Sequence, residues 1–216
     1  MAQLFHPIAN AYAKGSILFG GVLAGGLLFL GWAHERSAYV TSQNVVRDQP
    51  VPFSHNHHVS GLGLDCRYCH LSVEKAGFAG IPPTQVCYGC HQIIWKDVKM
   101  LEPVRASYKT GEPIAWNRVH DVPDFVYFNH SIHIAKGIGC ESCHGPVNQM
   151  PLIRKAKTLQ MDFCLDCHRN PEKNIREKED VFKFGVTPVS AERAKELVDE
   201  RKIVKKQLDN CWVCHR

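Results

Sequence analysis

A long apolar segment lies near the N-terminus of the chain. Residues 15–33, GSILFGGVLAGGLLFLGWA, hold no charged side chain between Lys14 and His34. As a helix they span ~28 Å, close to the thickness of the hydrocarbon core of a bilayer. The competing interpretation is a signal peptide cleaved after Ala33. We expect a retained anchor, and we assign residues 1–38 to a cytoplasmic N-terminus and a transmembrane helix.

Glycines interrupt this apolar segment at Gly20, Gly21, Gly25 and Gly26. The spacing of Gly21 and Gly25 would let the backbone of another membrane helix approach closely. A lipid-facing anchor that tolerates glycine is the alternative. We expect packing against helices of partner subunits.

The remainder of the chain, residues 39–216, has a different pattern. Leu197, Val204 and Leu208 fall on one helical stripe, and Thr187-Pro188 or Ser190 can cap its N-terminus. We therefore predict a helix from about Ser190 to Leu208. The other apolar positions show no strand-like alternation. The pattern predicts a mainly α-helical and irregular domain with little or no sheet.

The cysteines add chemistry to this picture, because all ten fall in five Cys-x-x-Cys-His motifs. Chance would supply about 0.03 copies of such a motif. Two thiols three residues apart can add to the vinyl groups of one porphyrin, and the adjacent imidazole then ligates its iron from the proximal side. We predict five covalent c-type haems, attached through Cys66 and Cys69, Cys87 and Cys90, Cys140 and Cys143, Cys164 and Cys167, and Cys211 and Cys214, with His70, His91, His144, His168 and His215 as proximal ligands.

Other uses of paired cysteines do not need this pattern. A structural zinc site or a disulfide framework has no use for a histidine after every second cysteine. A redox Cys-x-x-Cys normally occurs once, on a thioredoxin-like turn. The formal charge of +5 does not indicate nucleic acid either, since five haems with their propionates bring it to about zero. We predict no nucleic-acid partner.

An internal repeat organises four of the motifs. The pattern Phe-[Ser/Asn]-His-x-x-His occurs at residues 53–58 and 128–133, and each copy is followed by Gly-[Leu/Ile]-Gly and two haem motifs. This predicts two di-haem modules, residues 53–91 and 128–168. A C-terminal helix and the fifth haem occupy residues 188–216.

Five irons also need distal ligands if all are low-spin electron carriers. Histidines three residues apart project from one side of a helical turn and can reach two neighbouring irons. We assign the distal positions to His55, His58, His120, His130 and His133. His57 is then surplus. The assignment of His120 rests on counting, and Met150 or Met161 could take its place.

The residues described so far carry two resemblances. The repeated modules resemble class III multihaem cytochromes, with bis-histidine haems in a small irregular helical fold. The stretches PVPFSHNHHVSGLGLDCRYCH (residues 50–70), WNRVHDVPDFVYFNHSIH (116–133) and GCESCHG (139–145) resemble the pentahaem cytochrome c subunit of bacterial alternative complex III. That likeness covers nearly the whole chain, including the five motifs in order.

The second resemblance implies a context. It implies polytopic quinol-binding membrane subunits, an iron–sulfur subunit, and a periplasmic cytochrome c or terminal oxidase as electron acceptor. Because covalent haem attachment takes place outside the cytoplasmic membrane, we expect residues 39–216 on the periplasmic side of the cell membrane. The expected function is an electron-transfer subunit of a quinol:acceptor oxidoreductase complex, in respiration or photosynthesis.

Two other functions compete with this one. A stand-alone, membrane-anchored quinol dehydrogenase that feeds periplasmic reductases would use similar haems, but the fifth motif and the repeated module argue against it. A catalytic multihaem reductase needs an iron with an open face, and here all five motifs end in histidine while further histidines are abundant. We expect no catalytic site in this chain.

Overall fold

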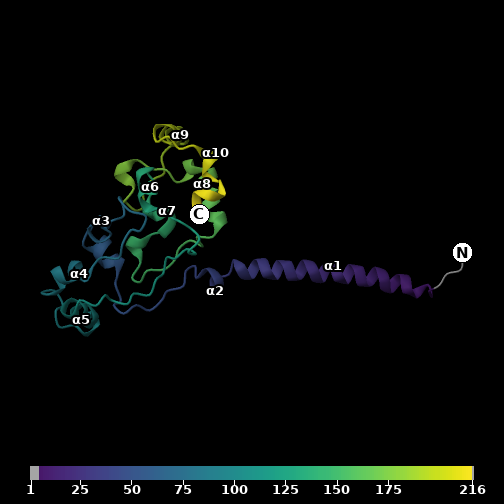
Figure 1. Cartoon of the computed structure of the whole chain (residues 1–216), viewed down its shortest axis with the longest axis horizontal. Helices are drawn as coiled ribbons and strands as arrows, with labels where there is room; N and C mark the ends of the chain where they lie inside the picture. Colours follow the sequence, from purple (N-terminus) through teal and green to yellow (C-terminus); the bar gives the residue numbers. More distant parts are fainter. Residues whose placement is uncertain (1–4, 216) are drawn as a thin grey trace. The chain divides into compact units, whose positions relative to one another are not determined.

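The computed structural model describes residues 5–215, and all of the regular elements in that range are helices (Figure 1). In chain order they are α1 (Ile8–Glu35), α2 (Ala38–Thr41), the π-helix η1 (Asn56–Gly61), α3 (Cys66–Cys69), α4 (Thr84–His91), η2 (Lys99–Leu101), α5 (Glu102–Thr110), α6 (His130–Ala135), α7 (Cys140–His144), η3 (Val147–Gln149), α8 (Met161–Arg169), η4 (Pro171–Lys173), η5 (Lys178–Asp180), α9 (Ala191–Glu200), α10 (Lys205–Leu208) and α11 (Cys211–Cys214). Within the described range, β-pairing is limited to three isolated bridges. The predicted helical and irregular fold with little or no sheet is confirmed.

The chain divides into two compact units, Met1–Ser42 and Gln43–Arg216. The first contains α1, which extends the predicted apolar segment at both ends. Of the helices in residues 5–215, the one at Ile8–Thr41, which includes α1, is long and apolar enough to cross a membrane. No side chain of α1 is buried. This is the exposure expected of a helix whose partner is lipid or another subunit.

The haem motifs lie on the short helices α3, α4, α7, α8 and α11 of the second unit. On a helical turn, residues at i and i+3 face the same side, so both cysteines of a motif point toward the same space. Local capping fixes where such a turn begins. At α3, the Asp65 carboxylate accepts a hydrogen bond of 2.8 Å from the backbone N–H of Arg67.

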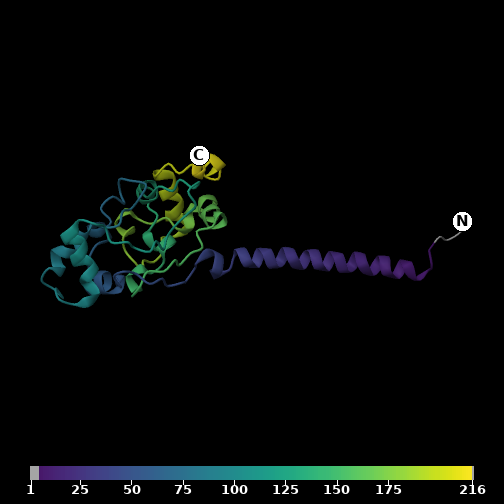
Figure 2. The ribbon, with the colours of Figure 1, turned by 60° about the horizontal axis from the view of Figure 1, so that its bottom comes forward.

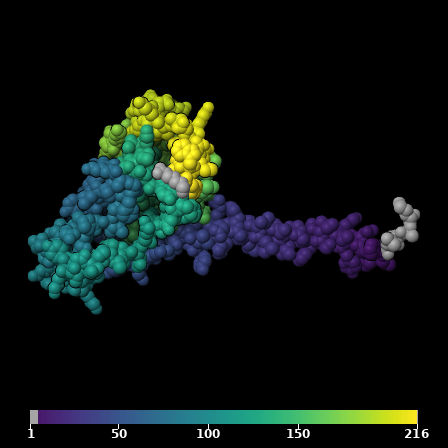
Figure 3. Space-filling view, viewed as in Figure 1, coloured from purple at the N-terminus to yellow at the C-terminus, as the bar shows by residue number. Residues whose placement is uncertain are grey.

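Conventional hydrophobic core is scarce in the second unit. Its two clusters of buried residues are small; one is Ile175, Ala194, Leu197 and Val198, and the other is Val51, Leu101 and Val104. Large apolar side chains are exposed instead, such as Trp212 at 68%. The surface is visibly hollowed between the first module, in blue, and the C-terminal residues, in yellow (Figure 3). A fold of this kind depends on bound groups to complete its packing.

The C-terminal helix differs from its prediction. The Ser190 hydroxyl caps α9 by accepting a hydrogen bond of 3.2 Å from the N–H of Arg193, and Leu197 is buried, both as predicted. The helix stops at Glu200, however, and α10 is a separate turn. The cause is the backbone at Lys202, whose φ of 53° belongs to the left-handed region. The prediction of one continuous helix to Leu208 was wrong.

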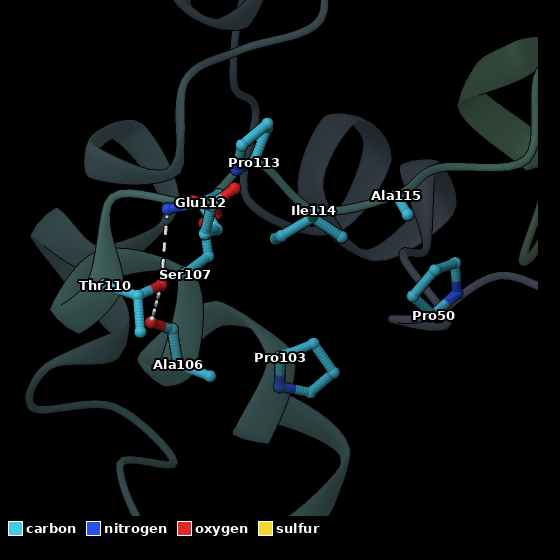
Figure 4. Close-up of a pocket in the computed structure, with 9 residues that line it drawn as sticks. All are labelled: Pro50, Pro103, Ala106, Ser107, Thr110, Glu112, Pro113, Ile114 and Ala115. Atoms are coloured by element: carbon cyan, nitrogen blue, oxygen red, sulfur yellow. Dashed lines mark hydrogen bonds between the residues drawn. The ribbon is translucent and has the colours of Figure 1, made fainter.

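A groove of about 260 Å³ lies against α5 (Figure 4). Its two hydroxyl groups are already paired. The Ser107 hydroxyl donates to the carbonyl of Glu112 at 2.5 Å, and the Thr110 hydroxyl donates to the carbonyl of Ala106 at 2.9 Å. The Ser107 bond holds the segment that follows α5 in place, and proline and other apolar side chains line most of the groove.

The turn after α9 is fastened to the second module by a reciprocal pair of hydrogen bonds. The Lys136 ammonium donates to the carbonyl of Arg201, and the Arg201 guanidinium donates to the carbonyl of Lys136 at 3.0 Å. The backbone at Gly137 makes room for this contact. Its φ is +77°, and a Cβ there would overlap the guanidinium and lie 2.8 Å from the carbonyl oxygen of Arg176.

We therefore expect Gly137→Ala to lower the free energy of unfolding by about 3 kcal/mol. The left-handed backbone accounts for about 1–2 kcal/mol and the displaced charged hydrogen bond for most of the rest. Gly185→Ala is the matched control, because Gly185 has a φ of +65° but no atom within 4 Å of its Cβ position. Urea unfolding of both holoproteins measures the difference, and equal losses would contradict the role of the Arg201 contact.

Candidate haem sites

The first copy of the repeated motif forms a compact aromatic turn. Phe53 lies between two imidazoles, edge-on to His55 at 4.8 Å and 90° and stacked on His58 at 4.4 Å and 26°. His55 is the N-cap residue of the π-helix η1, and His58 lies within this helix. His55 and His58 therefore face different neighbours from one turn.

The second copy has the same geometry on an ordinary helix. Phe128 is edge-on to His130 at 4.7 Å and 89° and stacked on His133 at 4.6 Å and 26°. Asn129 caps this helix, α6, by accepting a hydrogen bond from the N–H of Ile132. The repeat seen in the sequence is thus a structural repeat, with one phenylalanine holding two imidazoles in fixed orientations in each module.

The second histidine of each turn faces the proximal histidine of a haem motif. The ring centres of His58 and His91 are 6.2 Å apart, and those of His133 and His168 are also 6.2 Å apart. Two imidazoles on opposite sides of one metal ion should stand about 6.2–6.4 Å apart, since each metal–nitrogen bond is about 2.0–2.1 Å and the ring centre lies ~1.1 Å beyond. These two pairs have the spacing of axial ligands to a shared iron.

The remaining histidines of both modules gather in the centre of the unit. His130 and His144 are nearly parallel, with ring centres 6.3 Å apart at 10°. His120 lies closer to His144, at 4.3 Å and 68°, which is too near for an iron between them. His55 interacts electrostatically with His70 and His120. Three candidate distal ligands therefore surround the two proximal histidines His70 and His144. They are His55, His120 and His130.

Hydrogen bonds fix the tautomer of most of these imidazoles. A carbonyl oxygen can only accept, so a ring nitrogen bonded to one must carry the proton and leaves the other nitrogen as a lone pair. This arrangement presents Nε2 to a metal. Seven histidines bond through Nδ1 to a backbone carbonyl at 2.7–3.0 Å: His58, His70, His91, His130, His133, His168 and His215.

Two histidines in the centre each have a buried ring nitrogen without a hydrogen-bond partner. Nδ1 of His55 and Nε2 of His120 have no hydrogen-bond acceptor or donor. Burial lowers the pKa of each to about 4, and it lowers the pKa of His144 to about 3. All three are therefore neutral at pH 7, which is the form that ligates iron. An unpaired buried nitrogen is costly unless a bound group satisfies it, so these residues fit a haem.

The ten cysteines are unpaired with one another as disulfides, and all of them are at least partly accessible. Within each motif both thiols stand on one helical turn, as thioether attachment requires. The segment Val181–Phe182 lies against two motifs at once, with the Val181 carbonyl accepting from the N–H of Cys140 at 3.2 Å and the Phe182 carbonyl 4.0 Å from the Cys66 sulfur. Nothing in the sequence marked this segment as part of the site.

The surplus histidine His57 and the two methionines considered as ligands, Met150 and Met161, lie in different surroundings. His57, predicted to be surplus, is exposed and stacks on Trp95 at 5.6 Å and 23°. Met150 is fully buried, whereas Met161 is 67% exposed at the start of α8. The distal assignments of His55, His58, His120, His130 and His133 stay predictions, with the geometry above as their support.

Comparisons with known proteins agree with this chemistry. Residues 126–216 match the family described as "Cytochrome c7 and related cytochrome c". Over 119 residues the chain is 35% identical to the "Menaquinone reductase, multiheme cytochrome c subunit" of Nitratidesulfovibrio vulgaris (strain Hildenborough), an alignment that covers 55% of this chain and 53% of the relative. The chain thus spans about half the length of the curated relative that it matches. Both descriptions name a cytochrome c, which agrees with the covalently bound c-type haem that the sequence predicts.

Proposed function

We propose that this chain, a multihaem cytochrome c, is the electron-transfer subunit of a membrane complex that exchanges electrons with the quinone pool. The observation that carries the proposal is the combination of serial haem motifs with an apolar helix in one chain. The similarity to a menaquinone reductase subunit supports the link to quinone. Haem supplies a one-electron Fe(III)/Fe(II) couple, and the residues described above hold it in place.

The sequence motifs and the resemblance described above support a more detailed proposal. The chain binds five haems, its α1 helix spans the cell membrane, and the unit Gln43–Arg216 lies on the periplasmic side. Electrons from quinol, oxidised in polytopic subunits with an iron–sulfur partner, pass through this chain to a periplasmic cytochrome c or a terminal oxidase. This is the arrangement of an alternative complex III.

A second direction of electron flow has its own support. The similar protein from Nitratidesulfovibrio vulgaris is named for reducing menaquinone. In that direction this chain would accept electrons from a periplasmic donor and deliver them to quinone in the membrane. The same haems serve either direction, because the difference in reduction potential between donor and acceptor decides the sign of the flow.

The first test concerns the cofactor number. Intact-mass measurement of the natively matured protein should show five haem additions, since all ten cysteines fall in complete motifs. The double variant Cys211→Ala, Cys214→Ala should show four, because the other motifs belong to separate modules. Fewer than five additions to the fully matured parent would contradict the proposal.

The second test concerns the function. The chain is purified with its native partners under mild detergent, and the partners are identified by mass spectrometry. Addition of a menaquinol should reduce the haems if the proposed direction holds, whereas reduced periplasmic donors with menaquinone should produce quinol if the second direction holds. Absence of both reactions in a complex that retains its partners and its full haem spectrum would overturn the quinone link.

A further inference from the structure

We propose that the five haem motifs stand in single file in the order second, first, third, fourth, fifth, so that the two ends of the electron path are the second and fifth motifs. This rests on the haem binding proposed above and adds an order that differs from the order along the sequence. The contacts of each neighbouring pair of motifs carry the argument.

The second motif is joined to the first through the turn η1. His58 on this turn faces His91 of the second motif, with ring centres 6.2 Å apart. His55 on the same turn interacts with His70 of the first motif. The thiols of Cys69 and Cys87 also lie near enough to interact electrostatically. One turn therefore bridges these two motifs.

The first motif is joined to the third across the boundary between the modules. The thiols of Cys66 and Cys140, the leading cysteines of the two motifs, interact with each other, and both residues lie against Val181–Phe182. His130, at the start of the second module's turn, hydrogen-bonds through Nδ1 to the carbonyl of Gly77 at 2.8 Å. The two modules thus meet through their first motifs rather than end to end.

The third motif is joined to the fourth by the turn α6, as in the first module. His130 faces His144 of the third motif at 6.3 Å, and His133 faces His168 of the fourth at 6.2 Å. The Cys143 thiol also lies near enough to the thiols of Cys164 and Cys167 to interact with them electrostatically. The arrangement within each module is the same, with its turn reaching both of its motifs.

The fourth motif is joined to the fifth at the C-terminus. Nδ1 of His168 donates to the carbonyl of Leu208 at 2.8 Å, and Arg169 pairs with Asp209 at 3.7 Å, just before the fifth motif begins. The thiols of Cys164 and Cys214 also lie near enough to interact electrostatically. The fifth motif therefore extends the file beyond the fourth.

The ribbon shows the resulting order within the second unit. Helix α4, which carries the second motif, lies at one end with α5, while α3, α7 and α8 follow in turn toward the C-terminus (Figures 1 and 2). Because the modules meet through their first motifs, the second motif is turned away from the second module. Electron tunnelling falls steeply with distance, so neighbours in this file exchange electrons fastest. Haems held by these motifs would pass single electrons between neighbours, each donor being oxidised as its acceptor is reduced.

Iron positions in the holoprotein test the order directly. Anomalous X-ray scattering or electron cryomicroscopy of the full complex should show the second iron nearest to the first, the third between the first and the fourth, and the fifth nearest to the fourth. A second iron whose nearest neighbour lies in the second module, or a branched arrangement, would overturn the inference. Neither outcome decides whether the complex reacts with quinone, because the menaquinol and menaquinone assays test that separately.

Variants test the order in solution. Each haem should shift the midpoint potentials of its neighbours by charge interaction, so we expect Cys211→Ala with Cys214→Ala, which removes an end haem, to change the potential of one remaining haem. Cys164→Ala with Cys167→Ala, which removes an interior haem, should change two. Redox titration followed by electron paramagnetic resonance counts the haems affected. Removal of the second haem by Cys87→Ala with Cys90→Ala should also change the midpoint potential of one remaining haem. A change in two haems would contradict the proposed order of the motifs.

Discussion

We expect the reduced His133→Ala variant to bind one more molecule of carbon monoxide per chain than the parent protein. His133 stands 6.2 Å from His168, the spacing of two imidazoles on one iron, and its Nδ1 donates to the carbonyl of Asn129 at 2.7 Å. Removal of this imidazole leaves the iron five-coordinate, high-spin and open to a diatomic ligand. His58→Ala should have the same effect on the haem of the second motif.

The chain offers a close control for this prediction. His57 lies next to His58 on the same turn, but its ring is exposed and stacked on Trp95. His57→Ala should bind no additional carbon monoxide and should keep the parent's absorption and spin state. A gain of carbon monoxide binding in His57→Ala would show that the surplus histidine had been chosen wrongly.

A crossed pair of variants identifies which haem has been opened. Adding Cys164→Ala and Cys167→Ala to His133→Ala removes the haem that we assign to His133, so the new carbon monoxide site should disappear. Adding Cys87→Ala and Cys90→Ala instead should leave it. The opposite pattern would mean that His133 ligates a haem of the first module.

The sequence was sufficient to predict the haem chemistry because that chemistry is local. A Cys-x-x-Cys-His motif needs five consecutive residues and one helical turn, and all five motifs lie on short helices in the structure. The paired His-x-x-His turns were also visible as a repeat. Phe53 and Phe128 then proved to hold each pair in one orientation, a role that follows from their position two residues before the first histidine.

The order of the motifs in space could not be predicted in the same way. It depends on contacts between residues far apart in sequence, such as Cys66 with Cys140 and His130 with Gly77. The end of α9 could not be predicted either. Lys202 has a left-handed backbone with a φ of 53°, and a lysine gives no indication of that conformation in the sequence. The placement of His120 near His144 also required the fold, since counting alone had assigned it only to some fifth iron.

Replacing residues 1–42 with a cleavable signal peptide should move the cytochrome from the membrane fraction to the soluble periplasmic fraction almost completely. Residues 43–216 form a compact unit of their own, and every haem motif lies within it. The helix α1 has no buried side chain, and its apolar surface is the feature that favours the bilayer. Fractionation followed by haem-stained gels and absorption spectra measures the change.

The outcome separates anchoring from cytochrome folding. If the released unit carries the parent's haem number and spectrum, the N-terminal unit serves attachment and not haem binding. An otherwise identical chain in which an unrelated apolar helix replaces Ile8–Glu35 should return to the membrane. A truncated chain that matures fully but stays on the membrane would show that the haem unit itself binds membrane subunits, because no spanning helix would remain to hold it.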